Sequence, residues 1–431
     1  MRVPRRIPSL IAFLPLVAAL LGVPAFGPQA TRAGATSIQV TTTEDELTVD
    51  GECSLREAVI AANTNLAVDA CQAGNPGHDG IWLQPDAVYT LAIPGRGEDL
   101  AATGDLDVTE SLNVGLEVPG QTATIDGGDI DRIFDVADEV DNWTFRFLTL
   151  RNGDAGAGEG GAVRVGRGCT SPPDDHVNGA LQGLVIEDNH AAIGGGIHLG
   201  TCQNPFFQAN SIIGNTADET GGGVSVVGTT LLRVESSTFS GNSAGAAGGG
   251  IWADLDDGFL AVIFTTIARN TAPDGAGLWV GGEDWPIINA AIIAENTGPS
   301  CRSGVPLGGS GWIGDDGTCF FVDIADAGLE PLVQVGRNFV HPLSPDSPAI
   351  DFDQGTECAS GLIGDLAGNS RPLDGNGDGV AWCDAGSFEA AAIPFIPPSS
   401  TPPPPPAQLP DTAMRSGGGD PYSSSRRNGE H

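Results

Sequence analysis

The stretch LVIEDNHAAIGGGIHL at residues 184–199 decides the fold, because its pattern returns three times along the chain: SIIGNTADETGGGVSV from Ser211, STFSGNSAGAAGGGIWA from Ser237 and TTIARNTAPDGAGLWV from Thr265. In each, a short alternating strand ends at an Asn, and a loop of small residues and a Gly-rich turn lead into a second apolar strand. The apolar residues directly after the glycines are 27 residues apart: Ile197, Val224, Ile251 and Leu278. A fixed period of this size indicates a stacked repeat.

Two further segments extend the repeat in both directions, LTLRNGDAGAGEGGAVRV from Leu148 and AIIAENTG from Ala291. Strands this short cannot bury an apolar face alone, so each coil must stack on its neighbours, parallel and in register, about 4.8 Å apart. The leucine spacing of leucine-rich repeats and the 3.6-residue period of helical repeats are both missing from the sequence. The sequence therefore predicts an all-β parallel β-helix, or β-solenoid.

An Asn recurs immediately after the first strand of each repeat: Asn152, Asn189, Asn215, Asn242, Asn270 and Asn296. Asn tolerates the left-handed conformation of a tight bend, and stacked amides can hydrogen-bond along the axis as a ladder. We expect a structural role for these residues; the alternative is a row of amides that binds sugar hydroxyls. The glycines fit corners with positive φ or points where coils approach too closely for a Cβ atom.

Residues 1–35 open with Arg2, Arg5 and Arg6, continue through an apolar run at 7–23 and end in small residues. This order is typical of a secretory signal peptide, with an uncleaved membrane anchor as the alternative. No other stretch reaches 18 apolar residues, so no transmembrane segment is expected once the leader is removed. We expect a secreted or cell-surface protein; the sequence predicts no oligomeric state.

The chain is strongly acidic, and the leader holds four of its 19 basic residues, which leaves 15 against 55 Asp and Glu. Such a charge repels nucleic acid and anionic lipid surfaces, so no nucleic-acid partner is expected. All the basic residues are Arg, which excludes mechanisms that need a Lys base or Schiff base. The acidity fits a solubility or salt adaptation equally well.

Eight cysteines follow the leader, an even number that suggests four disulfides in an exported chain. Pairing of neighbours along the chain would close short loops, although other connectivities stay open: Cys53 with Cys71, Cys169 with Cys202, Cys301 with Cys319, and Cys358 with Cys383. No CxxC occurs, which argues against zinc or redox chemistry.

Before the coils, CSLREAVIAAN at residues 53–63 predicts a short amphipathic helix. Ser54 can cap its N-terminus, and an apolar stripe follows from Leu55. We expect this helix to plug the N-terminal end of the solenoid, because an uncovered end exposes backbone edges and core. Arg56 and Glu57 are interpreted as capping and surface charges.

These segments carry a family resemblance. CSLREAVIAAN, with GDLDVTESLNV at 104–114 and TIDGGDIDRIFDV at 124–136, resembles the bacterial CSLREA-domain proteins, and the GNTA…GGG repeats resemble their right-handed β-helix and the polymorphic outer-membrane protein repeats. SPAIDFDQGTEC at 347–358, GDLAGNSRPLDGNGDG from 364 and CDAGSFE at 383–389 are similar to the choice-of-anchor Q domain. The resemblance implies an exported, surface-associated, right-handed β-helix and brings no established catalytic residues.

We therefore expect five parts along the chain: a signal peptide at 1–35, a CSLREA cap at 36–75, parallel β-helix coils at 76–300, C-terminal coils with a choice-of-anchor Q-like cap at 301–391, and a disordered Pro/Ser/Gly-rich tail at 392–431. Within the tail, LPDTA at 409–413 resembles a sortase anchoring signal, but the apolar span that should follow it is missing. A chance match in a low-complexity tail is the alternative.

Calcium is the one cofactor that the sequence suggests. Asp374, Asn376 and Asp378 place oxygens at positions 1, 3 and 5 of a loop with Gly379 at position 6, the spacing that wraps a calcium ion. An EF-hand would place Glu at position 12, where Ala385 stands, so Asp384 or Glu389 would have to complete the shell. The alternative is a hairpin turn beside the expected bridge between Cys358 and Cys383.

Acidic residues close to tryptophans are the candidate catalytic groups: Asp254, Asp256, Asp257, Glu283 and Asp284, with Trp252, Trp279 and Trp285 nearby. Acids beside aromatic rings one coil apart could hold a sugar and supply an acid/base pair, as in polysaccharide lyases and glycoside hydrolases. Chance clusters are expected in so acidic a chain, however. The sequence favours a structural, adhesive or binding protein that contacts polysaccharide or another surface, with the carbohydrate-active enzyme as the alternative.

Overall fold

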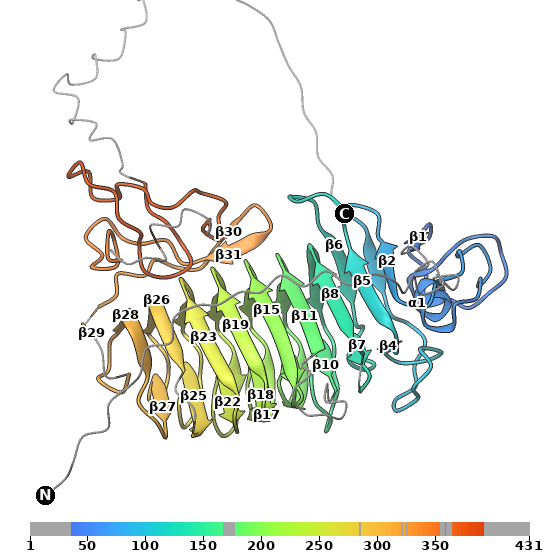
Figure 1. Cartoon of the computed structure of the whole chain (residues 1–431), viewed down its shortest axis with the longest axis horizontal. Helices are drawn as coiled ribbons and strands as arrows, with labels where there is room; N and C mark the ends of the chain where they lie inside the picture. The colour runs from blue at the N-terminus through green and yellow to red at the C-terminus, as the bar shows by residue number, and fades with distance from the viewer. Residues whose placement is uncertain are drawn as a thin grey trace, which may run out of the picture. The chain divides into compact units, whose positions relative to one another are not determined.

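The computed structural model describes residues 36–391 apart from 139, 167–176, 284–285, 320–321, 325, 354–357 and 359–363. These residues form a parallel β-solenoid, which confirms the predicted fold class: three ladders of parallel strands run side by side along the stack (Figure 1). One helix, α1 (Leu55–Thr64), is the only α-helical element of this described part.

The strands group into three long ladders and one short one. The first ladder contains β1 (Ser37–Gln39), β2 (His78–Trp82), β5 (Ser111–Gly115), β8 (Asn142–Arg146), β11 (Val177–Gln182), β15 (Gln203–Gln208), β19 (Leu231–Glu235), β23 (Phe259–Ile263), β26 (Ile287–Ala294) and β28 (Gly308–Gly314). The second contains β3 (Val88–Thr90), β6 (Ala123–Asp126), β9 (Leu148–Arg151), β12 (Val185–Glu187), β16 (Ser211–Ile213), β20 (Thr238–Ser240) and β24 (Thr266–Ala268), which pairs with the end of β26. The third contains β4 (Leu106–Val108), β7 (Phe134–Val136), β10 (Val163–Val165), β14 (Ile197–Leu199), β18 (Val224–Gly228), β22 (Ile251–Leu255), β25 (Leu278–Gly282) and β27 (Cys301–Ser303). The short one contains β13 (His190–Ile193), β17 (Thr216–Thr220) and β21 (Ser243–Ala244).

The core consists of columns of apolar side chains that repeat from coil to coil. The residues that follow the glycines are partners in the third ladder and are all fully buried: Ile197, Val224, Ile251 and Leu278. Strand residues alternate between the two faces of a sheet, so every second side chain of a strand turns inward. Each column removes apolar surface from water only because the next coil covers it, which makes stacking the condition for stability.

The Gly-rich turns bring consecutive coils into direct backbone contact. The N–H of Gly223 donates to the carbonyl of Gly249 in the next coil at 3.0 Å, and a Cβ atom on Gly223 would lie 2.6 Å from the carbonyl oxygen of Gly250. The first glycine of the turn, Gly221, has a φ of 70°. The turn therefore needs glycine for two reasons, a left-handed conformation at its start and close approach of two backbones at its end.

Five of the six repeated asparagines form a buried amide ladder. The Nδ2 atom of each donates to Oδ1 of the next at 2.9 to 3.1 Å, in the order Asn189, Asn215, Asn242, Asn270 and Asn296. The same Oδ1 atoms also accept the backbone N–H of the preceding Asn, at 2.9 to 3.1 Å. Amides bound in this way have no group free for a sugar hydroxyl, so their role is structural.

The expected position of Asn152 in this ladder is wrong. Asn152 aligns with Asp188, not with Asn189, because Arg151 pairs with Glu187 in the second ladder. Its φ is 54° and its Nδ2 donates to the carboxylate of Asp126 at 3.1 Å, while the N–H of Gly153 donates to Oδ1 of Asn189. The left-handed bend therefore precedes the ladder position by one residue in each coil, and Asn152 occupies the bend.

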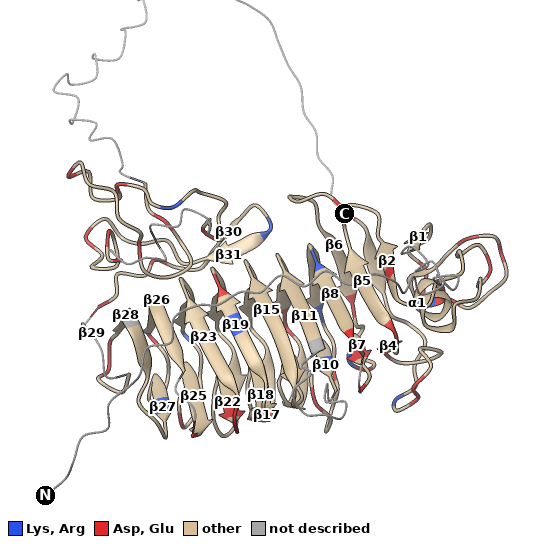
Figure 2. Cartoon of the chain, in the orientation of Figure 1, with Lys and Arg blue, Asp and Glu red and all other residues tan. Residues whose placement is uncertain are grey.

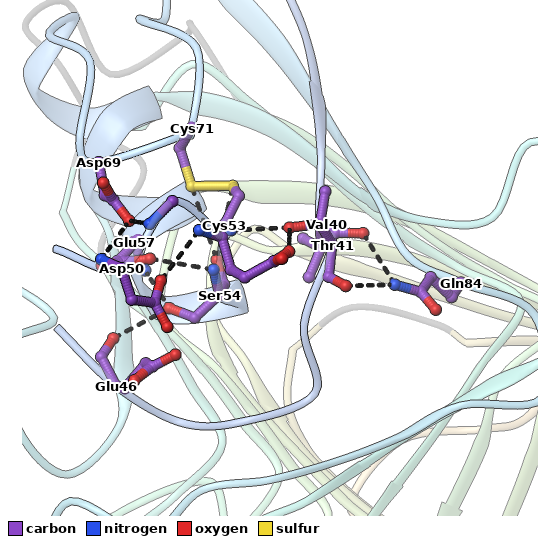
Figure 3. Close-up of a disulfide and its surroundings, with 12 residues drawn as sticks. Val40, Thr41, Glu46, Asp50, Cys53, Ser54, Glu57, Asp69, Cys71 and Gln84 are labelled. Atoms are coloured by element: carbon purple, nitrogen blue, oxygen red, sulfur yellow. Dashed lines mark hydrogen bonds between the residues drawn. A yellow bond between two sulfur atoms is a disulfide. The ribbon is translucent and has the colours of Figure 1, made fainter. Parts of the chain in front are cut away.

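Helix α1 begins with a complete capping box, as Figure 3 shows around the neighbouring disulfide. Ser54 Oγ accepts the N–H of Glu57 at 3.1 Å, and the Glu57 carboxylate accepts the N–H of Ser54 at 3.0 Å. These paired bonds satisfy backbone donors that a helix N-terminus otherwise leaves open. The helix packs against β1, β2 and β4.

The interpretation of Arg56 as a surface charge is wrong. Its side chain is fully buried, forms an ion pair with Asp45 at 2.6 Å and donates to the carbonyl oxygens of Ala101, Gly104 and Asp105 at 2.8 to 3.1 Å. A guanidinium has five N–H donors in a fixed plane, so it can bind several carbonyls at once. Arg56 thus holds the loop before β4 against the helix.

Three disulfides join neighbouring cysteines within the described residues: Cys53 with Cys71, Cys301 with Cys319, and Cys358 with Cys383. Cys202 is also disulfide-bonded, whereas Cys169 lies outside the described residues. Each of the three bonds closes a short loop of 18 or 25 residues in sequence separation, which restricts the unfolded chain.

The described residues between 326 and 391 pack against the outside of the second ladder, beside β16, β20 and β24 (Figure 1). The N–H of Phe339 donates to Ser211 Oγ at 2.8 Å, and the N–H of Ser387 donates to Thr266 Oγ1 at 2.9 Å. This segment contains one antiparallel hairpin, β30 (Val333–Val335) with β31 (Asn338–Val340), while β29 (Val322–Asp323) pairs with β28. The C-terminal residues therefore cover a lateral face of the coils.

Candidate functional site

The third ladder carries one outward-facing row of side chains that differs from coil to coil. The second residues of its eight strands are partners in register: Asp107, Asp135, Arg164, His198, Ser225, Trp252, Trp279 and Arg302. Their neighbours before and after point into the core, as Ile251 and Ala253 do around Trp252. Acidic residues stand at one end of the row and aromatic rings near the other, so the two ends offer different chemistry.

Trp252 and Trp279 form a stacked aromatic pair on β22 and β25. Their ring centroids are 5.3 Å apart and their planes differ by 16°, and both side chains are half-buried. A Cβ atom on Gly281 would lie 2.5 Å from Cη2 of Trp279 and 2.6 Å from Oδ1 of Asp254. The Trp279 ring and the Asp254 carboxylate therefore lie together over a strand position that has no side chain, which leaves both accessible from outside.

The other candidate acids follow the aromatic pair along the same two strands. Asp254 is exposed on β22, Asp256 and Asp257 are exposed in the turn that follows, and Glu283 is exposed just after β25. Asp284 and Trp285 lie outside the described residues. The acids lie at the same end of two neighbouring strands, since Asp254 pairs with Gly281, two residues before Glu283. Figure 2 shows acidic residues at the end of β22.

A shallow hollow continues the row beyond Trp279. Arg302 is the in-register partner of Trp279 on β27, and it lines the hollow together with Asp274, Ser303 and Thr318. The guanidinium of Arg302 lies 3.8 Å from Asp274 and is largely exposed. The aromatic pair and this hollow together provide apolar faces, carboxylates, a guanidinium and hydroxyl groups over three consecutive strands.

A second group of acidic residues lies at the other end of the row, on β4 and β7 (Figure 2). Asp105, Asp107 and Asp135 each offer a carboxylate oxygen, and the three oxygens lie within 4.8 Å of one another. Burial and repulsion from neighbouring acids raise the pKa of Asp105 to about 8 and that of Asp107 to about 7. Sequence reasoning missed this cluster, although LDV and FDV carry Asp at the same strand position.

The predicted calcium loop at residues 374–379 is exposed and held by its own backbone. The carboxylate of Asp374 accepts the N–H groups of Gly377 at 2.7 Å and Gly379 at 2.9 Å, and Asp378 Oδ1 accepts the N–H of Val380 at 2.8 Å. An isolated antiparallel bridge between Leu373 and Trp382 flanks the loop. These contacts match the hairpin-turn alternative, in which Asp and Gly serve the loop geometry.

The expected fourth ligand, Asp384, lies buried below the loop and is engaged elsewhere. Its Oδ1 accepts the N–H of Asp351 at 2.7 Å and its Oδ2 accepts the N–H of Ala390 at 2.5 Å. Burial raises its pKa to about 6 in spite of these bonds. Glu389 is also buried, in an ion pair with Arg371 at 2.7 Å. The two acids that could complete a calcium shell thus hold the C-terminal segment together.

Comparison with models of known protein families gives a match to part of the chain. Residues 236–254 match the Chlamydia polymorphic membrane protein repeat, over a stretch that contains β20, β21 and most of β22. No curated protein and no solved structure shows significant similarity to the chain. None of the described helices has the length and apolar character needed to cross a membrane. The repeat and the β-solenoid suggest a surface or outer-membrane-associated protein, and the disulfides suggest an extracellular location.

Proposed function

We propose that this chain is an exported surface protein that binds polysaccharide through the aromatic pair of the third ladder. The observation that carries this proposal is the stacking of Trp252 and Trp279 at 5.3 Å on adjacent strands, half-buried and beside the Asp254 carboxylate. Aromatic rings offer a flat apolar surface with few conformational states, and a small number of polar groups around such a surface fixes a ligand's orientation. A sugar ring has both an apolar face and polar hydroxyl edges.

The charge of the protein narrows the ligand to a neutral polysaccharide. The whole chain carries a formal charge of −36, so an acidic polymer would be repelled over its entire approach. Asp254, Asp274 and Arg302 can donate to or accept from hydroxyl groups without a charged partner. Coils stack about 4.8 Å apart, so the three strands that carry Trp252, Trp279 and Arg302 span about 10 Å, enough for two sugar rings.

The proposal also covers the handedness of the solenoid, the cover of its N-terminal end and the two segments that resemble known domains. We infer a right-handed solenoid whose N-terminal end is covered by α1, a CSLREA cap at 36–75 and a choice-of-anchor Q-like domain within 301–391. The contacts of α1 with β1, β2 and β4 support the cap, because these are among the first strands of the stack. The leader-like sequence at 1–35 and the three disulfides support export.

Retention on an array of neutral and acidic polysaccharides tests the proposal. The wild-type chain should be retained by at least one neutral polysaccharide, and Trp252→Ala and Trp279→Ala should each weaken retention about tenfold or more, as loss of an aromatic anchor does. Asn204→Ala is the matched control, because Asn204 is exposed on β15 of the first ladder, away from the row. Retention that both Trp variants keep would contradict the proposal.

The enzyme alternative rests on one observation, that the Asp254 carboxylate and the Trp279 ring both lie over Gly281. A glycosidase needs two carboxyl groups about 5 to 10 Å apart around the bound sugar, and Asp256, Asp257, Glu283 and Asp284 are the available partners. New reducing ends or unsaturated products from a retained polysaccharide would favour the enzyme, provided that Asp254→Asn abolishes them. Retention without products favours binding alone.

A further inference from the structure

The acidic cluster at the start of the third ladder is separate from the aromatic pair. Asp107 and Asp135 are partners in register on β4 and β7, and Asp105 stands directly before β4. Asp105 and Asp107 are almost fully buried and Asp135 is partly buried, with 16% of its side chain exposed. Five strands of the ladder separate Asp135 from Arg302, the last residue of the row. Nothing in the proposed sugar contact involves these acids.

Two arginines neutralise only part of this charge. Arg132 forms ion pairs with Asp135 and, at 3.6 Å, with Asp105, and Arg164 Nη1 lies 2.8 Å from Asp135 Oδ1. Asp131, also buried, brings the carboxylates to four against two guanidiniums. With all four carboxyls ionised, two negative charges are in excess within a largely buried group, an arrangement that is costly unless a cation or protons compensate it.

One carboxylate oxygen of the cluster has no partner. Asp105 Oδ1 is buried, and among the described residues no group donates a hydrogen bond to it. The other Asp105 oxygen faces Arg132, and Asp107 Oδ2 accepts the N–H of Ala101 at 2.7 Å. A buried carboxylate oxygen without a donor loses the hydration that stabilises it in water. Of the ten buried side-chain nitrogen and oxygen atoms that have no hydrogen-bond partner among the described residues, Asp105 Oδ1 is the only carboxylate oxygen, so it indicates a missing ligand.

We propose that Asp105, Asp107 and Asp135 bind one calcium ion. All three ligand atoms are carboxylate oxygens, which hard divalent cations prefer, and no His or Cys contributes to the cluster. Calcium binds oxygens at about 2.3 to 2.6 Å, so ligands on opposite sides of one ion are about 4.6 to 5.2 Å apart. The oxygens of this cluster lie within 4.8 Å of one another, which lets a single ion reach all three. Its two positive charges match the two excess negative ones.

The site would stabilise the first coils. Asp105 lies in the loop that Arg56 binds through the carbonyls of Ala101, Gly104 and Asp105, and Asp135 belongs to the next coil. An ion between them links the loop after β3 to β7 and, through Arg56, to α1.

Calorimetric titration of the chelator-treated full chain with calcium chloride tests this site. The wild-type chain should bind calcium, and Asp105→Asn and Asp107→Asn should each weaken binding about tenfold or more, since each removes a ligand charge. The matched control is the double variant Asp374→Asn, Asp378→Asn, which removes the acids of the exposed loop and should bind calcium within about twofold of wild type. Far-UV circular dichroism checks that each variant is folded.

No calcium binding by the wild type at 10 mM would overturn the proposal. Binding that both Asp105→Asn and Asp107→Asn retain, or that the loop double variant loses, would also overturn it. Equally tight magnesium binding would refute the assignment to calcium, whatever the variants show.

Discussion

The buried amide ladder makes the strongest stability prediction, because Asn242 lies in its middle. Its Oδ1 accepts the backbone N–H and the Nδ2 of Asn215, both at 3.0 Å, and its Nδ2 donates to Ile212 O and Asn270 Oδ1, both at 2.9 Å. Asn242→Ala removes all four hydrogen bonds in a position with no solvent exposure. Water cannot replace them, so the full cost of the lost partners is felt.

The size of this effect follows from the number of bonds. A net contribution of about 1 kcal/mol per hydrogen bond gives about 4 kcal/mol for Asn242→Ala. At least one of the groups left behind, the backbone N–H of Asn215, has its acceptor removed outright, and such an orphan costs about 1 to 3 kcal/mol. A loss of about 4 kcal/mol is a large part of the 5 to 15 kcal/mol that stabilises a typical domain.

Asn204→Ala is the matched control for this variant. Asn204 also stacks on an Asn of the neighbouring coil, since its Nδ2 donates to Asn178 Oδ1 at 3.0 Å, but both side chains are exposed. We expect it to cost less than about 1 kcal/mol, because water satisfies the groups left behind. Urea unfolding followed by far-UV circular dichroism measures both variants. If Asn242→Ala shifts the midpoint no more than Asn204→Ala, the ladder does not stabilise the coils.

Three further predictions address other parts of the fold. Arg56→Ala should lower the unfolding free energy by about 3 to 5 kcal/mol, because it leaves the buried Asp45 carboxylate without its counter-ion. Arg96→Ala breaks an exposed ion pair and should change the unfolding free energy by less than about 1 kcal/mol in the same urea experiment. Gly223→Ala should cost about 1 to 3 kcal/mol through its contact with Gly250 O, and Gly304→Ala, which meets nothing within 4 Å, should be nearly neutral in a thermal melt. In chelator, stability should fall as pH rises from 6 to 9: the folded-state pKa values of about 8 for Asp105 and about 7 for Asp107 lie above the unfolded value, so the folded chain binds more protons. Asp105→Asn should flatten this pH dependence, and an unchanged slope would contradict the raised pKa of Asp105.

The coils could be predicted from the sequence because their geometry repeats. Glycines at 27-residue intervals fixed the register of the third ladder, and the apolar residues after them are the buried column from Ile197 to Leu278. Alignment of the Asn residues by identity puts Asn152 one position away from its place in the coil. Aligning the strands first, Leu148 with Leu184, places Asn152 opposite Asp188 at the bend, as the pairing of Arg151 with Glu187 does.

Features outside the period were harder to predict from the sequence. The packing of the described residues between 326 and 391 on the side of the second ladder depends on hydroxyl side chains at equivalent outward positions, Ser211, Thr238 and Thr266. Small polar residues in strands usually face solvent. No local sequence pattern indicates that a distant segment of the chain buries these three side chains. The burial of Arg56 had the same cause, since the carbonyls it binds lie more than 40 residues away in sequence.

The two candidate sites follow from the same property of a solenoid. Inward positions repeat because each coil must fit the next, and stability is a sum over neighbouring coils. Outward positions are free of this constraint, so the row from Asp107 to Arg302 can change its chemistry along the stack without disturbing the core. Packing of the core therefore does not explain why some outward side chains are buried, paired or stacked across coils. Asp105 with its orphaned oxygen and Trp252 against Trp279 are two such places, and they lie on the same ladder at different distances from α1.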